Sequence, residues 1–294
     1  MIITIWGVRG SIATPGAGTV KYGGNTSCVV AQIDDVFIIF DSGTGIRVFG
    51  NHIVKTGTKL NGHLFMSHMH WDHIQGFPFF VPAYIPGNTL NIYEHEDISM
   101  TLEIFFKHRM MKSPNFPVEM KEMGATINFI PMKESVEIRS DDTIIAIVKN
   151  IRLNHPDPTL GYSIEDVKSQ KRFVYATDTE HFHEKTIDEN LRKFVTGADV
   201  LLYDAQYTDE EYYGHNQKMV KQGWGHSTWK EGLKIASASL VSCLLLCHHD
   251  PEHDDEMLTA IENEAKIYLK ENRLSLPGVE SVEMAYEGLV IDLD

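Results

Sequence analysis

The feature that constrains this chain most is an apolar run that ends in four side chains able to bind metal. Leu64-Phe65-Met66-Ser67 leads directly into His68-Met69-His70-Trp71-Asp72-His73. Alternate residues of extended backbone share a face, so His68, His70 and Asp72 can converge on one side, while His73 turns in as a helix begins. The alternative is a solvated polar loop with chance histidines. The chain has 15 histidines in 294 residues, so four ligand types at this spacing after a strand favour a metal site.

The number of these side chains indicates two ions. Four donors within six residues are too many for one ion at one point. The segment therefore predicts His68 and His70 on one ion, with Asp72 and His73 on the other. Imidazole and carboxylate ligands suit zinc, with manganese or iron as alternatives. We expect two divalent ions, with zinc as the first choice.

Hydrophobic periodicity predicts two successive sets of strands and helices. In the first half, strands are expected at 2–6, 28–33, 36–40, 63–67, 89–93 and 127–130, and helices at 45–55, 74–84 and 97–111. In the second half, strands are expected at 143–149, 161–165, 172–176, 200–203, 242–247 and 283–292, and helices at 183–193, 227–238 and 254–272.

This pattern suits an α+β fold in which two packed sheets are covered by helices on both outer faces. A doubly wound parallel fold is the alternative. It fits less well, because short turns join the early strands and imply antiparallel pairing.

Charge and hydropathy exclude some classes of partner. The formal charge of −15 argues against a large nucleic acid, since that binding needs a basic face. Two divalent ions would make one site locally positive, which permits a small anionic ester. No apolar run approaches the length needed to cross a bilayer, and the apolar start at Met1–Trp6 reads as a strand and not as a signal peptide.

The three cysteines indicate a reduced, cytoplasmic protein. Cys28, Cys243 and Cys247 cannot all pair with one another. A zinc knuckle of Cys243, Cys247 and His248 is conceivable. The apolar run between those cysteines favours a buried strand with core thiols.

The run His68-x-His70-x-Asp72-His73 after an apolar strand resembles the signature of the metallo-β-lactamase superfamily. That resemblance implies one four-layer αββα domain over residues 1–294, with a dinuclear site at its rim. It also implies three further ligands in order along the chain: His155 near a strand end, Asp178 as the carboxylate that bridges both ions, and His248 after another buried strand. The alternatives are a loop residue for His155, an Asx turn or helix cap for Asp178, and His249 in place of His248.

Within the superfamily the chain resembles the phosphodiesterase branch that includes ribonuclease Z. The motifs that carry this resemblance are Tyr22–Ser27, Asp41–Gly45, Tyr203–Tyr207 and Gly225–Thr228. By that resemblance His226 lies opposite the ions, is oriented by Asp204 and acts as general acid, and Asp72 belongs to the catalytic set. The alternative for His226 is a neighbour of a helix N-cap, and both can hold together.

One feature of ribonuclease Z is missing. In that family a long Gly/Pro-rich arm grips tRNA, and much of it lies between the equivalents of His155 and Asp178. This chain has no room for it there. We therefore expect a small phosphodiester substrate: a cyclic nucleotide, a cyclic ribose phosphate or a short nucleotide. The alternatives are lactone, thioester or β-lactam hydrolysis, tRNA 3′ processing, and a non-catalytic binding protein.

One segment and several residues have more than one interpretation. The segment at about 95–125 is a possible helical lid, a dimer contact or a helix packed on the sandwich. Arg9 meets a substrate phosphate or forms a structural ion pair. His181 and His183 are candidate substrate contacts, and a homodimer is expected by resemblance alone.

Overall fold

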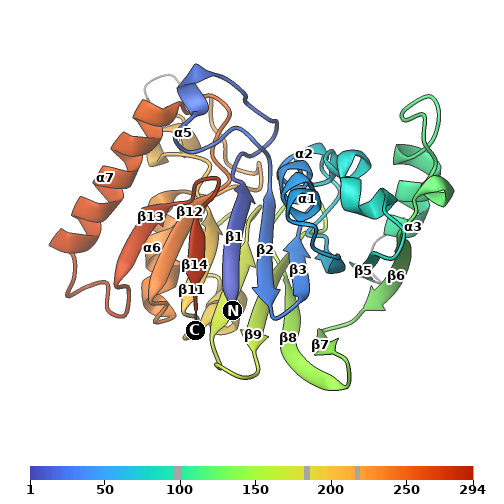
Figure 1. The fold of residues 1–294 in the computed structure, drawn as a ribbon. Helices are drawn as coiled ribbons and strands as arrows, with labels where there is room; N and C mark the ends of the chain where they lie inside the picture. The colour runs from blue at the N-terminus through green and yellow to red at the C-terminus, as the bar shows by residue number, and fades with distance from the viewer. Residues whose placement is uncertain (96–100, 182–185, 216–218, 294) are drawn as a thin grey trace.

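Two seven-stranded sheets face each other, and helices cover the outer face of each (Figure 1). The computed structural model describes residues 1–95, 101–181, 186–215 and 219–293. The α+β, four-layer αββα prediction is confirmed. The doubly wound parallel alternative is wrong, because each sheet begins with antiparallel strands.

The first sheet comes mainly from the N-terminal half and has the order β14-β1-β2-β3-β4-β5-β6. Its first strands are antiparallel and its later ones, from β3 onward, parallel. The strands are β1 (Ile2–Gly7), β2 (Cys28–Ile33), β3 (Val36–Phe40), β4 (Asn61–Phe65), β5 (Thr89–His95), β6 (Thr126–Met132) and β14 (Val290–Asp292).

The second sheet follows the same scheme, in the order β13-β12-β11-β10-β9-β8-β7. Strands β7 to β10 pair antiparallel, and β10 to β13 pair parallel. The strands are β7 (Ser135–Ser140), β8 (Thr143–Arg152), β9 (Leu160–Asp166), β10 (Arg172–Ala176), β11 (Val200–Asp204), β12 (Cys243–Cys247) and β13 (Ser281–Met284).

Three apolar clusters hold the four layers together. One lies between the sheets, one beneath the helices of the first sheet and one beneath those of the second. The helices of the first half are α1 (Gly45–Thr56), α2 (Trp71–Ile74) and α3 (Leu102–Phe105), and those of the second half are α4 (Glu189–Val195), α5 (Asp209–Tyr212), α6 (Trp229–Ala238) and α7 (Asp255–Glu271). Within the described ranges, no helix is long and apolar enough to span a membrane.

Two predicted elements differ most from the structure, and strand β7 was not predicted. The single strand expected at 283–292 is two strands in different sheets, because the chain turns at Gly288, whose φ is 87°. The helix expected at 74–84 is short turns at Phe77–Phe79 and Val81–Tyr84, since the prolines at 78 and 82 interrupt it. Strand β7 lies at a sheet edge and was not predicted, although its apolar Val136 and Ile138 alternate with polar residues. The start of the helix expected at 183–193 lies outside the described residues.

The described part of the 95–125 segment packs on the first sheet. Residues 97–100 of the helix expected there lie outside the described residues. Helix α3 continues into a π-helical turn, Phe106–Met110. Phe106 and Met111 are fully buried in the outer apolar cluster, and the Phe106 ring lies 4.3 Å from that of Phe77. These residues therefore belong to the core, as the packing interpretation expects.

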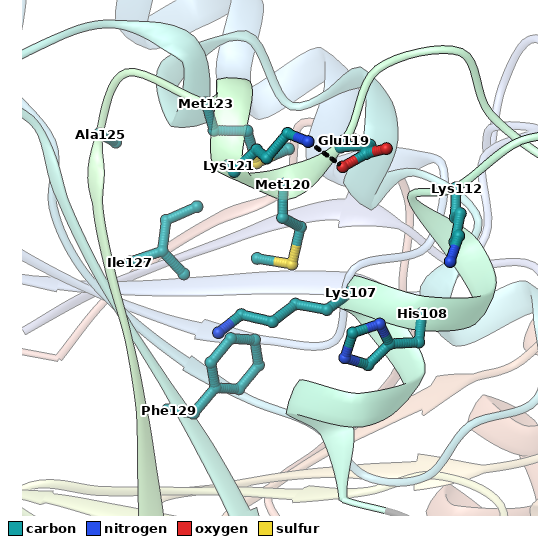
Figure 2. A pocket seen from close by; sticks show the side chains of 10 residues that line it. All are labelled: Lys107, His108, Lys112, Glu119, Met120, Lys121, Met123, Ala125, Ile127 and Phe129. Carbon is teal, nitrogen blue, oxygen red and sulfur yellow. Dashed lines mark ion pairs between the residues drawn. The ribbon is translucent and has the colours of Figure 1, made fainter.

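A cavity of about 550 Å³ lies between this segment and β6 (Figure 2). Figure 2 shows Lys107 extended beside the Phe129 ring and Lys121 paired with Glu119, whose charged atoms are 2.7 Å apart. None of its lining residues belongs to the His and Asp cluster described below.

Replacing Phe106 with alanine is expected to lower the free energy of unfolding by about 3–5 kcal/mol, because the lost ring leaves a cavity in the core. Ile104, two residues earlier, is 48% exposed. Ile104→Ala is the matched control and should cost about 0.5 kcal/mol or less. Chemical denaturation measures both. Equal costs would show that Phe106 is not a core residue.

Candidate metal centre

The candidate site lies where strands of both sheets end. Asp41 follows β3, and the His68–His73 segment follows β4. From the second sheet, Asp178 follows β10, Asp204 ends β11 and His248 follows β12, while His155 comes shortly after β8. The carboxyl ends of parallel strands meet at one edge of a sheet, and α/β proteins bind ligands there. Two such edges face each other here.

Two groups of ligand atoms form at this edge, and within each group they lie within 4.8 Å of one another. The first group is His68, His70, His155 and Asp178, and the second is Asp72, His73, Asp178 and His248. The structure thus brings together all seven residues proposed from the sequence. It divides the His68–His73 segment between two groups as expected.

Asp178 belongs to both groups. Its Oδ1 lies 3.7 Å from Nε2 of His68, and its Oδ2 lies 3.1 Å from Nε2 of His73 and 3.3 Å from Nε2 of His248. The residue is 1% exposed, and its φ of 57° turns the chain sharply after β10. Each carboxylate oxygen therefore faces a different half of the site, which is the geometry of a bridging ligand.

Asp41 is a residue whose role the sequence did not reveal. Its Oδ2 lies 2.7 Å from Nδ1 of His73 and accepts hydrogen bonds from Ser67 Oγ and Tyr175 Oη. Its Oδ1 accepts from the Ser67 amide. A carboxylate that accepts a hydrogen bond from Nδ1 fixes the orientation of the imidazole and leaves Nε2 free to bind a metal ion. The signal in the sequence was a carboxylate directly after a fully buried strand.

Polar side chains also contact Nδ1 of other histidines in the site. Nδ1 of His248 lies 3.0 Å from Gln206 Oε1, and Nδ1 of His68 lies 3.0 Å from Ser67 Oγ. Nδ1 of His155 lies 3.0 Å from Thr159 Oγ1. His70 is the exception, because its half-exposed ring places Nε2 2.8 Å from Asp157 Oδ2.

The donor set fits divalent cations. Nε2 of His68 and Nε2 of His73 are buried and have no hydrogen-bond partner of good geometry among the described residues, although the latter lies near Asp178. An unsatisfied buried nitrogen is costly, and a cation would satisfy it. Asp72 and Asp178 add carboxylates that are at most 4% exposed.

The pKa values of the histidines in this cluster also indicate a cation site. Burial alone would lower the pKa of His248, but Asp178 and its neighbouring carboxylates raise it to about 9. The pKa of His73 is also raised against burial, by Asp178, Asp72 and Asp41. Without a cation the cluster therefore binds protons to balance its carboxylates.

His226 lies beside the two groups. Its Nδ1 lies 2.8 Å from Asp204 Oδ2, and its ring stacks on that of His248 with centroids 4.8 Å apart. Asp204 also accepts from the amides of Asp178 and Ser227, which holds it in place. Asp204, His226 and His248 form a third group that a metal could use. The structure therefore shows His226 oriented by a carboxylate that is itself held in place.

A pocket of about 390 Å³ opens over this site. Its lining residues are Ser11, Met69, His70, Trp71, Asp72, Asp178, His226 and His248. His226 lines the pocket and lies next to the start of helix α6, which Thr228 caps, while its role as general acid stays a prediction.

Two alternative site residues lie elsewhere. Nε2 of His249 bonds the carbonyl of Ala285, and His249 belongs to neither ligand group. Arg9 is fully buried and donates to the carbonyls of Gly23, Asp250 and His253. The expected contact between Arg9 and a substrate phosphate is therefore wrong. Its hydrogen bonds go to backbone carbonyls, and it forms no ion pair with any residue that the structure describes.

The remaining candidates are also accounted for. His181 is buried, with Nδ1 3.0 Å from Ser227 Oγ and its ring 4.3 Å from that of Tyr212, and it does not line the pocket. His183 lies outside the described residues. Cys28 and Cys247 are free and buried, and Cys243 is partly buried, as expected of core thiols.

Asp41→Asn is expected to weaken metal binding about 10- to 100-fold, because the amide no longer holds His73 as an anion does. Tyr175→Phe removes one neutral donor from the same carboxylate and should have a smaller effect. Competition with a chromogenic chelator measures both affinities. Wild-type affinity in Asp41→Asn would show that the Asp41–His73 contact does not orient a ligand.

Comparison with known proteins agrees with this geometry. The model of the β-lactamase superfamily domain matches residues 38–249, more than half of the chain. Ribonuclease Z of Picrophilus torridus is 26% identical, over 93% of this chain and 93% of that protein. Ribonuclease Z of Thermoplasma acidophilum is 24% identical, over 86% and 87%.

Solved structures share the fold. A metallo-β-lactamase fold protein of Bacillus subtilis superposes with a TM-score of 0.67 at 18% identity, over 99% of this chain and 98% of that one. The short form of human tRNase Z gives 0.64 at 18% identity, over the whole of both chains. A diphosphatase of the PhnP family gives 0.63 at 17% identity, over 99% and 97%.

Proposed function

Because this chain belongs to the metallo-β-lactamase superfamily and carries the His and Asp clusters of a dinuclear metal site, we propose that it is a metal-dependent phosphodiesterase for small substrates. The observation that carries the proposal is the Asp204–His226 pair at the wall of the pocket. Hydrolysis of a phosphodiester must protonate a leaving alkoxide, and such a pair can provide the proton.

We assign one ion to His68, His70, His155 and Asp178 and the other to Asp72, His73, Asp178 and His248. Zinc is the first choice, with manganese or iron as alternatives. When bound, two divalent ions polarise a phosphoryl oxygen and lower the pKa of water.

The protein's own residues orient the proton donor. Asp204 keeps Nδ1 of His226 protonated and fixes the ring. Nε2 is then the atom that exchanges the proton with the leaving oxygen. Stacking on His248 places this ring directly beside the second ligand group.

A small substrate fits the chain better than tRNA. The relatives are named as ribonuclease, tRNase and diphosphatase, which supports chemistry at phosphate. The interval between His155 and Asp178 contains strands β9 and β10 and their short connections. It therefore leaves no room for the arm expected there by resemblance to ribonuclease Z. The net charge of −15 also disfavours a long polyanion. A cytoplasmic location and a homodimer stay predictions.

A substrate panel tests the proposal. Protein loaded with zinc, and separately with manganese, is assayed with bis(p-nitrophenyl) phosphate, cyclic nucleotides, cyclic ribose phosphate, a lactone, a thioester, nitrocefin and a precursor tRNA. We expect the highest kcat/KM on a small phosphodiester. Faster turnover of the lactone, thioester or nitrocefin would reject the phosphodiesterase assignment. Bound metal without turnover of any substrate would indicate a binding protein.

A further inference from the structure

An exposed tryptophan stands beside the candidate metal ligands. Trp71 is the first residue of helix α2 and precedes Asp72, which is 4% exposed. The indole itself is 68% exposed and lines the same pocket as Asp72, Asp178 and His226. For each Å² of the ring that remains in water, the fold lacks about 25 cal/mol of hydrophobic stabilisation.

The fold gives no packing reason for this side chain. Among the described residues, the indole of Trp71 makes no hydrogen bond and no ring contact. The first position of a short helix does not require an aromatic residue, and the buried contacts of α2 come from Asp72, His73 and Ile74. A large rigid aromatic at the mouth of a pocket is typical of a ligand contact.

The rim continues on the other side of Asp72. Ser11 also lines the pocket and donates its amide to Asp72 Oδ2 over 2.8 Å. Met69 also lines the pocket. The pocket thus combines metal-binding groups with the apolar surfaces of Trp71 and Met69. This arrangement matches a ligand that joins a phosphate to a flat apolar group.

We propose that Trp71 is a stacking platform for a nucleobase attached to the scissile phosphate. The substrate would then be a short or cyclic nucleotide and not a cyclic ribose phosphate. This inference rests on the proposed phosphodiesterase function and narrows its substrate class. One base–aromatic stack corresponds to about a 5- to 150-fold change in binding.

The test compares substrates that release the same p-nitrophenolate and differ in the group that remains. These are thymidine 5′-(p-nitrophenyl) phosphate, its analogue with an abasic deoxyribose, and methyl p-nitrophenyl phosphate. Trp71→Ala should lower kcat/KM for the thymidine substrate about 5- to 150-fold, mainly through KM, and leave the other two within about twofold. Trp71→Phe should retain most of the wild-type value.

Controls separate stacking from damage to the site. Phe79 is 55% exposed but does not line the pocket, so Phe79→Ala should leave all three substrates unchanged. Metal content is measured for each variant because Trp71 adjoins Asp72. An equal loss on all three substrates, or an equal loss on the thymidine and abasic ones, would overturn the base-stacking role.

Failure of the proposed function gives a different result. If the wild-type protein cleaves none of the three substrates, the phosphodiesterase assignment fails. Stacking is then decided by titrating thymidine 5′-monophosphate and following tryptophan fluorescence. Quenching in the wild type that is lost in Trp71→Phe supports the platform, and equal quenching in both proteins rejects it.

Discussion

Replacing Asp178 with asparagine is expected to remove bound metal from both groups and to lower turnover by about 10³-fold or more. The two carboxylate oxygens face different halves of the site, at 3.1–3.7 Å from three imidazole nitrogens. Asparagine has nearly the same shape but is neutral and offers one oxygen. The loss follows because two ions contribute several kcal/mol of charge stabilisation in the transition state, and each 1.36 kcal/mol is tenfold in rate.

Metal analysis and steady-state kinetics measure this variant together. Asp166→Asn is the matched control, since Asp166 is a buried carboxylate that pairs with the N-terminal amine, away from the site. It should keep two ions per chain. If Asp178→Asn retains two ions with wild-type affinity, then Asp178 does not bridge them.

His226→Ala is expected to lower turnover about 10²- to 10⁴-fold while both ions stay bound, because a positioned general acid contributes that much. The loss should depend on the leaving group. A ribose alkoxide, as in a 3′,5′-cyclic nucleotide, needs a proton more than p-nitrophenolate does. The cyclic nucleotide should therefore lose more activity than bis(p-nitrophenyl) phosphate.

The same variant tests whether His226 is a general acid or a metal ligand. His226 also belongs to a third possible metal group with Asp204 and His248. Loss of an ion in His226→Ala would show that it is a ligand, and an equal loss on both leaving groups would argue against the acid role. His181→Ala, which changes another buried histidine next to Ser227, should remain close to wild type.

Local patterns predicted many of the strands and the ligands of the His68–His73 segment, whereas His155, Asp178 and His248 were predicted from the family resemblance. Strands such as Cys28–Ile33, Val36–Phe40 and Arg172–Ala176 were predicted with the bounds that the structure has, because turns flank continuous apolar runs. The proposed ligands each follow such a run or lie near its end. The burial of a strand, and which residues follow it, depend on a single segment, so both can be predicted from the sequence of that segment.

Contacts between distant segments were harder to predict. Asp41 holds His73 because β3 and β4 pair in parallel, with Phe40 opposite Phe65. Arg9 was a candidate phosphate contact, but its Nε and Nη1 donate to three backbone carbonyls instead. Such partners are set by which strands become neighbours, and no local period records that choice.

The division of the ligands between the two halves of the chain has a thermodynamic consequence. His68–His73 extend from the first sheet, whereas His155, Asp178 and His248 extend from the second. A loaded site would be a reversible cross-link between the sheets. Binding to the folded state alone adds about 2.7 kcal/mol of stability at an ion concentration 100 times Kd. The free metal concentration around the protein would thus change its free energy of unfolding, and with it the lifetime of the folded protein.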